Sequence, residues 1–188
     1  MNKKLFLFMA LTVLLTSAAW AQSANGYGQL TWGATIADTL ALYPNLVRAN
    51  RAVADSRNPA NDFSDRGILA YSEQNAGNDI DRRLFFFYQG RLFLVREQYD
   101  VSDVDIATIR NQVESVYGQL TRQPTEKGRV RGPAGIPVNV IVNAYMFTCD
   151  NLEIEVALIE GSTLFIRRSG IMVEYRNPLI YRQVLAAR

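Results

Sequence analysis

The chain has 188 residues, of which 48% are hydrophobic and 20% are charged, and its formal net charge is +2. That length suffices for one domain with a hydrophobic core. The absence of histidine removes the commonest general base and most transition-metal sites, and a single cysteine excludes an intramolecular disulfide.

The first 21 residues have the three parts of a secretory signal peptide. Lys3 and Lys4 form a positive end, an apolar run extends from Leu5 to Leu15, and Ala19-Trp20-Ala21 is a small-x-small cleavage site. A membrane-spanning helix needs roughly 20 apolar residues, so this segment is short for an anchor. The sequence predicts cleavage after Ala21 and a periplasmic protein that begins at Gln22.

Removal of those 21 residues leaves 167, with 18 basic and 18 acidic groups because Lys3 and Lys4 are lost. The neutral charge balance of the mature chain predicts no nucleic-acid partner. The mature chain has no second long apolar stretch, so we predict no transmembrane span after cleavage. The single cysteine, Cys149, lies far from the cleavage site. A bacterial lipoprotein would have its acylated cysteine where Gln22 stands.

The mature chain begins with a polar leader over residues 22–31, and a short helix is expected next. Thr35 fits the N-cap position and Asp38 completes a capping box. Pro44 ends the helical pattern. One apolar stripe follows from the spacing of Ile36, Leu40 and Tyr43.

A long polar segment over residues 45–67 is interpreted as a loop, and an aromatic hairpin follows it. The strands Leu84–Tyr88 and Arg91–Tyr99 are joined by Gln89-Gly90, a hairpin signal. The consecutive aromatic residues Phe85 to Tyr88 must point to both faces of their strand. We favour core packing for them over an exposed binding surface.

The second half repeats the order of a capped helix followed by strands. Ser102 is the expected N-cap, with Asp105 three residues later, and Gly118 ends the helix. Its apolar face would be Ile106, Ile109, Val113 and Val116. A breaker-rich stretch over residues 123–137 is interpreted as a second long loop.

A four-stranded antiparallel meander and a short terminal helix are expected next. Alternation of apolar and polar residues predicts the strands Val138–Phe147, Leu152–Ile159, Thr163–Arg168 and Ile171–Tyr175. Asn177-Pro178 starts the helix. Its apolar residues, which could cover an end of the sheet, are Leu179, Ile180, Val184 and Leu185.

These elements predict an α+β fold in which helices pack on one face of an antiparallel sheet. The fold would use a helix-then-strands unit twice and end in a short C-terminal helix. We expect a single domain over residues 32–188, with two similar halves at 32–100 and 101–188.

Candidate chemistry is sparse. Glu153 and Glu155 share one strand face about 7 Å apart, the arrangement of a carboxylate pair, although Arg167 or Arg168 could pair with them across the sheet. Cys149 has no histidine to generate its thiolate, so we expect it to be inert. The acidic residues Asp100, Asp103 and Asp105 lack the glycine and glutamate of a calcium loop and fit helix capping better.

The most concentrated positive patch of the mature chain contains Lys127, Arg129 and Arg131. It is our candidate binding site for phosphate head groups, cell-wall carboxylates or an acidic protein face. A solvated loop is the competing interpretation.

The segment from Trp32 to Leu40, with Tyr43-Pro44, resembles the helix opening of small bacterial envelope modules of the outer-membrane-assembly lipoprotein type. The hairpin Phe85–Tyr99 and the later Tyr117-Gly118 resemble tandem helix-and-sheet periplasmic proteins with a TATA-binding-protein-like layout. This chain departs from the lipoproteins in lacking the lipobox cysteine, so the resemblance does not carry over membrane anchoring. It implies no catalytic residue.

We therefore expect a non-enzymatic periplasmic module, without a cofactor or metal, that binds an envelope protein or a cell-wall component. Two alternatives remain open. One is an envelope hydrolase acting through Glu153 and Glu155, and the other is a carrier that holds a small apolar ligand between the aromatic hairpin and the helices.

Overall fold

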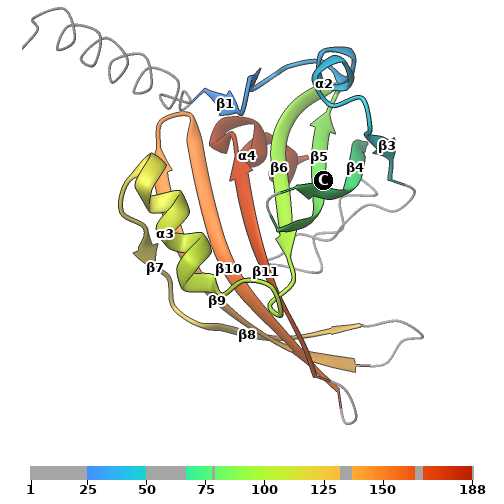
Figure 1. The fold of residues 1–188 in the computed structure, drawn as a ribbon. Helices are drawn as coiled ribbons and strands as arrows, with labels where there is room; N and C mark the ends of the chain where they lie inside the picture. Colours follow the sequence, from blue (N-terminus) through green and yellow to red (C-terminus); the bar gives the residue numbers. More distant parts are fainter. Residues whose placement is uncertain (1–24, 50–66, 78, 132–136, 164–166, 188) are drawn as a thin grey trace, which may run out of the picture.

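The computed structural model describes residues 25–49, 67–77, 79–131, 137–163 and 167–187. The expected signal peptide and most of the first expected loop lie outside these residues. One nine-stranded antiparallel sheet dominates the described part of the chain, in the order β3-β4-β5-β6-β11-β10-β9-β7, with β8 also pairing with β9 (Figure 1). A separate two-stranded hairpin, β1–β2, precedes it.

The elements of the first half are β1 (Gly26–Tyr27), β2 (Leu30–Thr31), α2 (Ile36–Leu42), β3 (Val47–Arg48), β4 (Ile68–Gly77), β5 (Ile80–Tyr88) and β6 (Arg91–Tyr99). Those of the second half are α3 (Ile106–Tyr117), β7 (Thr121–Arg122), β8 (Glu126–Arg131), β9 (Pro137–Cys149), β10 (Leu152–Ser162), β11 (Arg167–Arg176) and α4 (Pro178–Ala186). β1 and β2 lie within the segment interpreted as a polar leader.

The prediction of an α+β fold is wrong. Strands make up 56% of the described residues and helices 21%, so the fold is dominated by its sheet. The helices also do not share one face, because α2 and α3 pack against one side of the sheet and α4 against the other (Figure 1). We call these sides the α3 face and the α4 face.

The strands of the second half are longer than expected. β10 continues through Gly161-Ser162 and β11 continues through Ser169-Gly170, at positions where the sequence suggested turns. Ten successive residue pairs join β10 to β11, from Glu153 opposite Arg176 to Ser162 opposite Arg167. The expected four-stranded meander is therefore three long strands, because continuous pairing with β10 carries β11 through Ser169-Gly170, and pairing with both β9 and β11 carries β10 through Gly161-Ser162.

Some strands lie in segments that the sequence analysis interpreted as loops. β3 begins at Val47, and β8 occupies Glu126–Arg131 within the second expected loop. β7 and β8 pair one after the other with the outer edge of β9, interrupted around Pro124. Edge strands need to satisfy only one neighbour, so they can form from the short, charged and proline-interrupted sequences that are typical of loops.

Two of the three predicted helix caps are confirmed. Thr35 caps α2 and forms a capping box with Asp38, and Asn177 caps α4 with Pro178 in its first turn. The third cap is not the expected Ser102, because the side chain of Asp105 accepts the hydrogen bond from the Thr108 amide at 2.8 Å.

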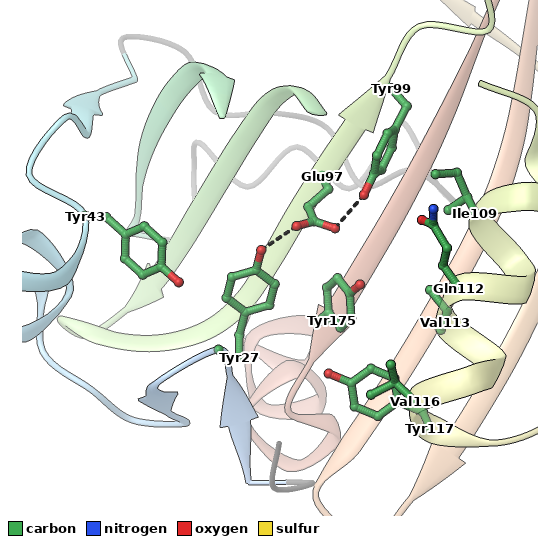
Figure 2. Close-up of a pocket in the computed structure, with 11 residues that line it drawn as sticks. Tyr27, Tyr43, Glu97, Tyr99, Ile109, Gln112, Val113, Val116, Tyr117 and Tyr175 are labelled. Carbon is green, nitrogen blue, oxygen red and sulfur yellow. Dashed lines mark hydrogen bonds between the residues drawn. The ribbon is translucent and has the colours of Figure 1, made fainter. Parts of the chain in front are cut away.

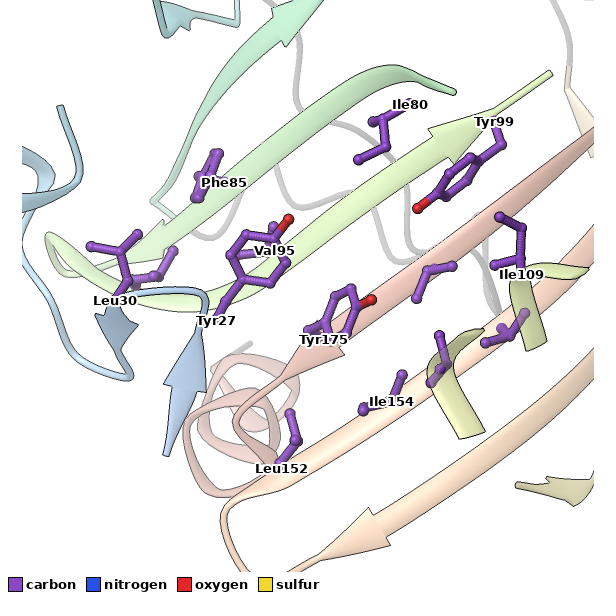
Figure 3. Packing of buried hydrophobic residues seen from close by; sticks show 14 of the residues in the cluster. Tyr27, Leu30, Ile80, Phe85, Val95, Tyr99, Ile109, Leu152, Ile154 and Tyr175 are labelled. Carbon is purple, nitrogen blue, oxygen red and sulfur yellow. The ribbon is translucent and has the colours of Figure 1, made fainter. Parts of the chain in front are cut away.

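The hydrophobic core has one part on each face of the sheet. On the α3 face, Phe85, Val95 and Tyr175 pack with Tyr27 and Leu30 of the first hairpin (Figure 3). Other buried members of this part are Phe87, Ile109, Val113, Leu152, Ile154, Val156, Ile171 and Val173. The predicted core packing of the aromatic run is confirmed, and its residues point to both faces as expected.

On the α4 face, Phe86, Phe93 and Leu94 pack against Tyr181 and Val184 of α4. Phe93 and Leu94 are neighbours in sequence yet share this face because the β5–β6 register shifts between the pairs Phe86–Leu94 and Phe87–Leu92. Such a bulge adds one residue to a strand and bends it. The bulge therefore places two consecutive residues of β6, Phe93 and Leu94, against α4.

The inner edge of β6 pairs with two distant parts of the chain. Next to the turn that joins β5 to β6, the Leu92 amide donates to Ala34 and the Gly33 amide donates to Leu92, both at 2.9 Å. Farther along, β6 pairs with β11 from Leu94 to Tyr99. The first hairpin and α2 are therefore attached to the same strand that receives the C-terminal strand.

We expect Asp105→Ala to lower the free energy of unfolding by about 1 kcal/mol, because it removes the side chain that caps α3. Ser102→Ala is the matched control and should change stability by less than about 0.5 kcal/mol, since Ser102 is exposed and caps nothing. Urea titrations of both variants measure the difference. Equal losses would contradict the assignment of the cap.

Candidate functional site

A tyrosine-lined pocket of about 310 Å³ opens on the α3 face (Figure 2). One wall comes from β1 and the end of α2, the floor comes from β6 and β11, and the opposite wall comes from α3. The described residues that line it are Tyr27, Gly28, Tyr43, Glu97, Tyr99, Ile109, Gln112, Val113, Val116, Tyr117 and Tyr175. We call it the tyrosine pocket.

Glu97 is the one carboxylate that lines this pocket among the described residues, and it is 95% buried, with a relative exposure of 5%. Its Oε1 accepts a hydrogen bond from the Tyr27 hydroxyl. Its Oε2 accepts one from the Tyr99 hydroxyl at 2.9 Å (Figure 2). Two phenols therefore hold the Glu97 carboxylate in place. Tyr27 lies 70 positions from Glu97 in the sequence, and Tyr99 lies 2 positions from it.

Arg83 on β5 supplies the positive charge next to Glu97. Its Nε lies 3.4 Å from Glu97 Oε1, and its Nη1 lies 2.6 Å from Glu73 Oε1. The guanidinium also lies 5.7 Å from the ring centroids of both Tyr27 and Tyr43. One guanidinium thus serves two carboxylates, and the cluster of Glu73, Arg83 and Glu97 carries one more negative than positive charge.

The hydroxyls of the other three pocket tyrosines differ in their hydrogen bonding from those of Tyr27 and Tyr99. The Tyr43, Tyr117 and Tyr175 hydroxyls make no hydrogen bond to another residue of the described ranges. The Tyr175 ring packs against Tyr27 at 5.1 Å and Tyr117 at 6.1 Å between centroids. These rings form a continuous aromatic surface whose hydroxyls can donate to or accept from a bound molecule.

Burial raises the pKa of all five pocket tyrosines above the ordinary value. Desolvation is the largest cause in each, and the nearby negative charge of Glu97 raises the pKa further. Burial raises the pKa of Tyr27, Tyr99 and Tyr175 well above the ordinary value of a phenol. The phenols therefore stay neutral across the physiological range.

The wall of the pocket opposite α3, formed by β1 and the end of α2, depends on the backbone conformation of a glycine. Gly28 has φ +59°, the left-handed region that favours glycine, in the turn between β1 and β2. A Cβ at this position would lie 2.9 Å from the Tyr43 hydroxyl. The turn can therefore approach the end of α2 closely, and this brings Tyr27 and Tyr43 to the same side of the pocket.

A second charged cluster lies on the α4 face, where the candidate pair Glu153 and Glu155 is found. Arg176 lies 2.9 Å from Glu153 Oε2, 3.3 Å from Glu155 Oε2 and 3.3 Å from Glu174 Oε2. Its guanidinium also stacks 4.6 Å from the Tyr181 ring centroid. The two glutamates do share a face, as expected, but their cation is Arg176 rather than Arg167 or Arg168.

The Arg176 cluster continues across the sheet to β6. Arg96 Nε donates to Glu174 Oε1 at 2.6 Å, and both side chains are almost completely buried. Glu155 lines a cavity of about 80 Å³, and Glu153 does not. The cluster thus consists of ion pairs within the fold, and Glu153 and Glu155 do not converge on the tyrosine pocket.

The basic candidate residues lie on β8, an edge strand. Lys127 pairs with Ile141 and Arg129 pairs with Asn139 on β9, and both side chains are exposed. Arg131 occupies the last position of β8, opposite Pro137. None of these residues lines the tyrosine pocket, so the candidate site and the pocket are separate places on the molecule.

The remaining candidates have ordinary environments. Asp100 accepts a hydrogen bond from the Ser102 amide at 2.9 Å, and Asp105 caps α3. Cys149 ends β9 as a partly buried free thiol. No group of acidic residues or cysteines in the described ranges could hold a metal ion. Among the same residues, no helix has the length and apolar character needed to cross a bilayer.

Sequence reasoning did not identify Glu97 as a site residue, although the signal was present. Glu97 alternates with Val95 and Tyr99, so it shares their buried face of β6. The hydroxyl partner Tyr27 was not identifiable in this way, because the two residues are 70 positions apart. Their meeting depends on how the first hairpin attaches to the sheet.

Comparisons with protein families, curated proteins and solved structures found no match to this chain.

We expect Arg176→Met to destabilise the protein by about 3–5 kcal/mol, because it leaves the buried Glu155 and Glu174 and the partly buried Glu153 without their shared cation. Arg168→Met is the matched control, since Arg168 is exposed. Its effect should stay below about 0.5 kcal/mol. Denaturant titrations near neutral pH measure both, and a large effect of Arg168→Met would contradict the assigned partner.

Alkaline pH should destabilise the fold through the pocket tyrosines. Their pKa is raised in the folded state, so above about pH 10 the folded protein binds more protons than the unfolded chain, and stability falls as pH rises. Tyrosinate absorbance from these residues should increase together with loss of circular dichroism. Ionisation of all nine tyrosines before unfolding would contradict this. Tyr175→Phe should reduce the slope of stability with pH.

Proposed function

We propose that this protein is a non-enzymatic binding module of the cell envelope and that it holds a small molecule in the tyrosine pocket. The observation that carries the proposal is the concave, aromatic site in which Tyr43, Tyr117 and Tyr175 offer hydroxyls with no hydrogen-bond partner among the described residues. Ligand sites are typically apolar clefts with a few placed polar groups.

The dimensions and composition of the pocket support a small ligand. Its volume of about 310 Å³ is at the lower end of the range for small-molecule sites. Ile109, Val113 and Val116 of α3 provide the apolar part of its surface, and the Gln112 amide adds one polar group at its margin. The pocket lies between β6 of the aromatic hairpin, β11 and α3, close to the location considered for a carrier, but the phenols and Glu97 favour a ligand with polar character.

Binding fits the pocket better than hydrolysis does. General acid–base hydrolysis by carboxylates needs two that converge on the substrate. The tyrosine pocket has Glu97 alone among its described lining residues, and both of its oxygens already accept hydrogen bonds from phenols. A carboxylate held in this way can fix the charge and shape of a site without transferring a proton.

The envelope location is the part of the proposal that rests on the sequence. The first 21 residues have the charge, apolar run and cleavage site of a signal peptide, and they lie outside the described residues. A binding module in the periplasm would meet small solutes that cross the envelope. An envelope protein or cell-wall component that contacts the exposed Lys127 and Arg129 remains compatible with this role.

The proposal predicts that Gln112→Trp blocks binding, because the indole would fill the margin of the pocket from the exposed side of α3. Ser115→Trp is the matched control, since Ser115 is exposed on the same helix and does not line the pocket. Thermal shift against a panel of small cationic, neutral and anionic solutes measures binding.

We expect at least one solute to raise the melting temperature of the unchanged protein and of Ser115→Trp, and to have little effect on Gln112→Trp. Equal responses of the two tryptophan variants would place binding outside the pocket and overturn the proposal. A panel with no response would overturn it for solutes of these classes.

A further inference from the structure

We propose that the ligand of the tyrosine pocket is a small organic cation, an alkylated ammonium group held between the tyrosine rings and the carboxylate of Glu97. This inference rests on the proposed function and names the ligand class of the same site. It is carried by three features of the described residues: the excess negative charge, the aromatic surface, and the absence of a cationic side chain from the pocket lining.

The charge balance next to the pocket favours a cation. Glu97 and Glu73 share Arg83, so this buried cluster has an uncompensated negative charge. Arg83 approaches Glu97 only at 3.4 Å and is much closer to Glu73, at 2.6 Å. Charges interact more strongly where water is excluded, so a positive group in the pocket would compensate the remaining charge.

The tyrosine rings of the pocket are the second feature that favours a cation. A cation within about 6 Å of a tyrosine ring centroid is attracted by the negative face of the ring. The protein already uses this interaction here, because Arg83 lies 5.7 Å from the centroids of Tyr27 and Tyr43. Tyr99, Tyr117 and Tyr175 line the same pocket and have no such cation among the described residues. Their rings can therefore surround a second positive group.

The lining disfavours anions. No lysine or arginine is among the described residues that line the pocket, and the neighbouring Arg83 is already paired with Glu73 and Glu97. A carboxylate or phosphate would therefore be repelled by Glu97 without gaining an unpaired cation. The apolar side chains Ile109, Val113 and Val116 suit methyl or methylene groups rather than a fully hydrated ion. An ammonium with alkyl substituents satisfies both conditions.

Choline and its neutral analogue, in which carbon replaces the quaternary nitrogen, form the decisive pair of probes because they have the same shape. Isothermal titration of the mature protein should give an affinity for choline at least about tenfold higher than for the analogue, the ratio expected for a cation–π and charge contribution of about 1.4 kcal/mol. Pivalate, an anion of similar bulk, should not bind.

Glu97→Gln tests the carboxylate. It keeps the size of the side chain and removes its charge, and its amide nitrogen cannot accept one of the two phenol hydrogen bonds. Affinity for choline should therefore fall by a larger factor than affinity for the neutral analogue, and the remaining preference is the part that the rings contribute. Asp150→Asn is the matched control, because Asp150 is exposed in the β9–β10 turn, and it should preserve the preference for choline. Tyr117→Leu removes a ring at the side of the pocket and should also weaken choline more than the analogue, which provides a test if Glu97→Gln does not fold.

The outcomes separate this inference from the proposed function. Equal or tighter binding of the neutral analogue, or tight binding of pivalate, would overturn the cation and leave a ligand-binding pocket. A choline preference that stays undiminished in both Glu97→Gln and Tyr117→Leu would place the cation elsewhere. If none of the three probes binds, the inference of a small alkylated ammonium is wrong, and the response of Gln112→Trp to the solute panel still decides whether the pocket binds a ligand.

Discussion

The structure depends on the pairing of β6 with β11, which joins the two halves of the sheet. Its register sets Arg96 opposite Glu174 and Glu97 opposite Val173. Since successive residues of a strand point to opposite faces, a shift by one residue would move Glu97 away from Tyr27 and turn Arg96 away from the Arg176 cluster. One register therefore places neighbouring charged residues of β6 in different clusters, Glu97 on the α3 face and Arg96 on the α4 face.

Both clusters bury ionisable groups, and they do so with different partners. The Arg176 cluster combines two guanidinium groups with three carboxylates beneath α4, whereas Glu97 is held mainly by phenols. Buried ion pairs add little net stability over apolar residues, but breaking one is costly. We interpret both clusters as constraints on register, because no neighbouring register would satisfy them. The tyrosine pocket thereby receives a carboxylate whose position is fixed before any ligand arrives.

Local patterns were sufficient to predict the elements that depend on local interactions. The caps at Thr35 and Asn177 and the hairpin at Gln89-Gly90 involve residues within a few positions of one another, and the structure has all three. The edge strand β8 was missed because its pairing with β9 outweighs its loop-like composition. Glu97 and Tyr27 were missed as a pair for the same reason: the contact between them is made by tertiary structure, and a charged residue in a strand ordinarily indicates a solvent-facing position.

The position of β11 in the sheet also constrains how the protein can fold. It is the last strand along the described residues, yet it lies between β6 and β10, in the middle of the strand order. A nascent chain that stops before β11 would have two incomplete sheets, each with an open edge available for mispairing. The native topology can therefore be completed only after β11 has been synthesised, and non-local pairing of this kind is slow. Such an order of assembly suits a polypeptide that stays unfolded until residues 167–176 are available.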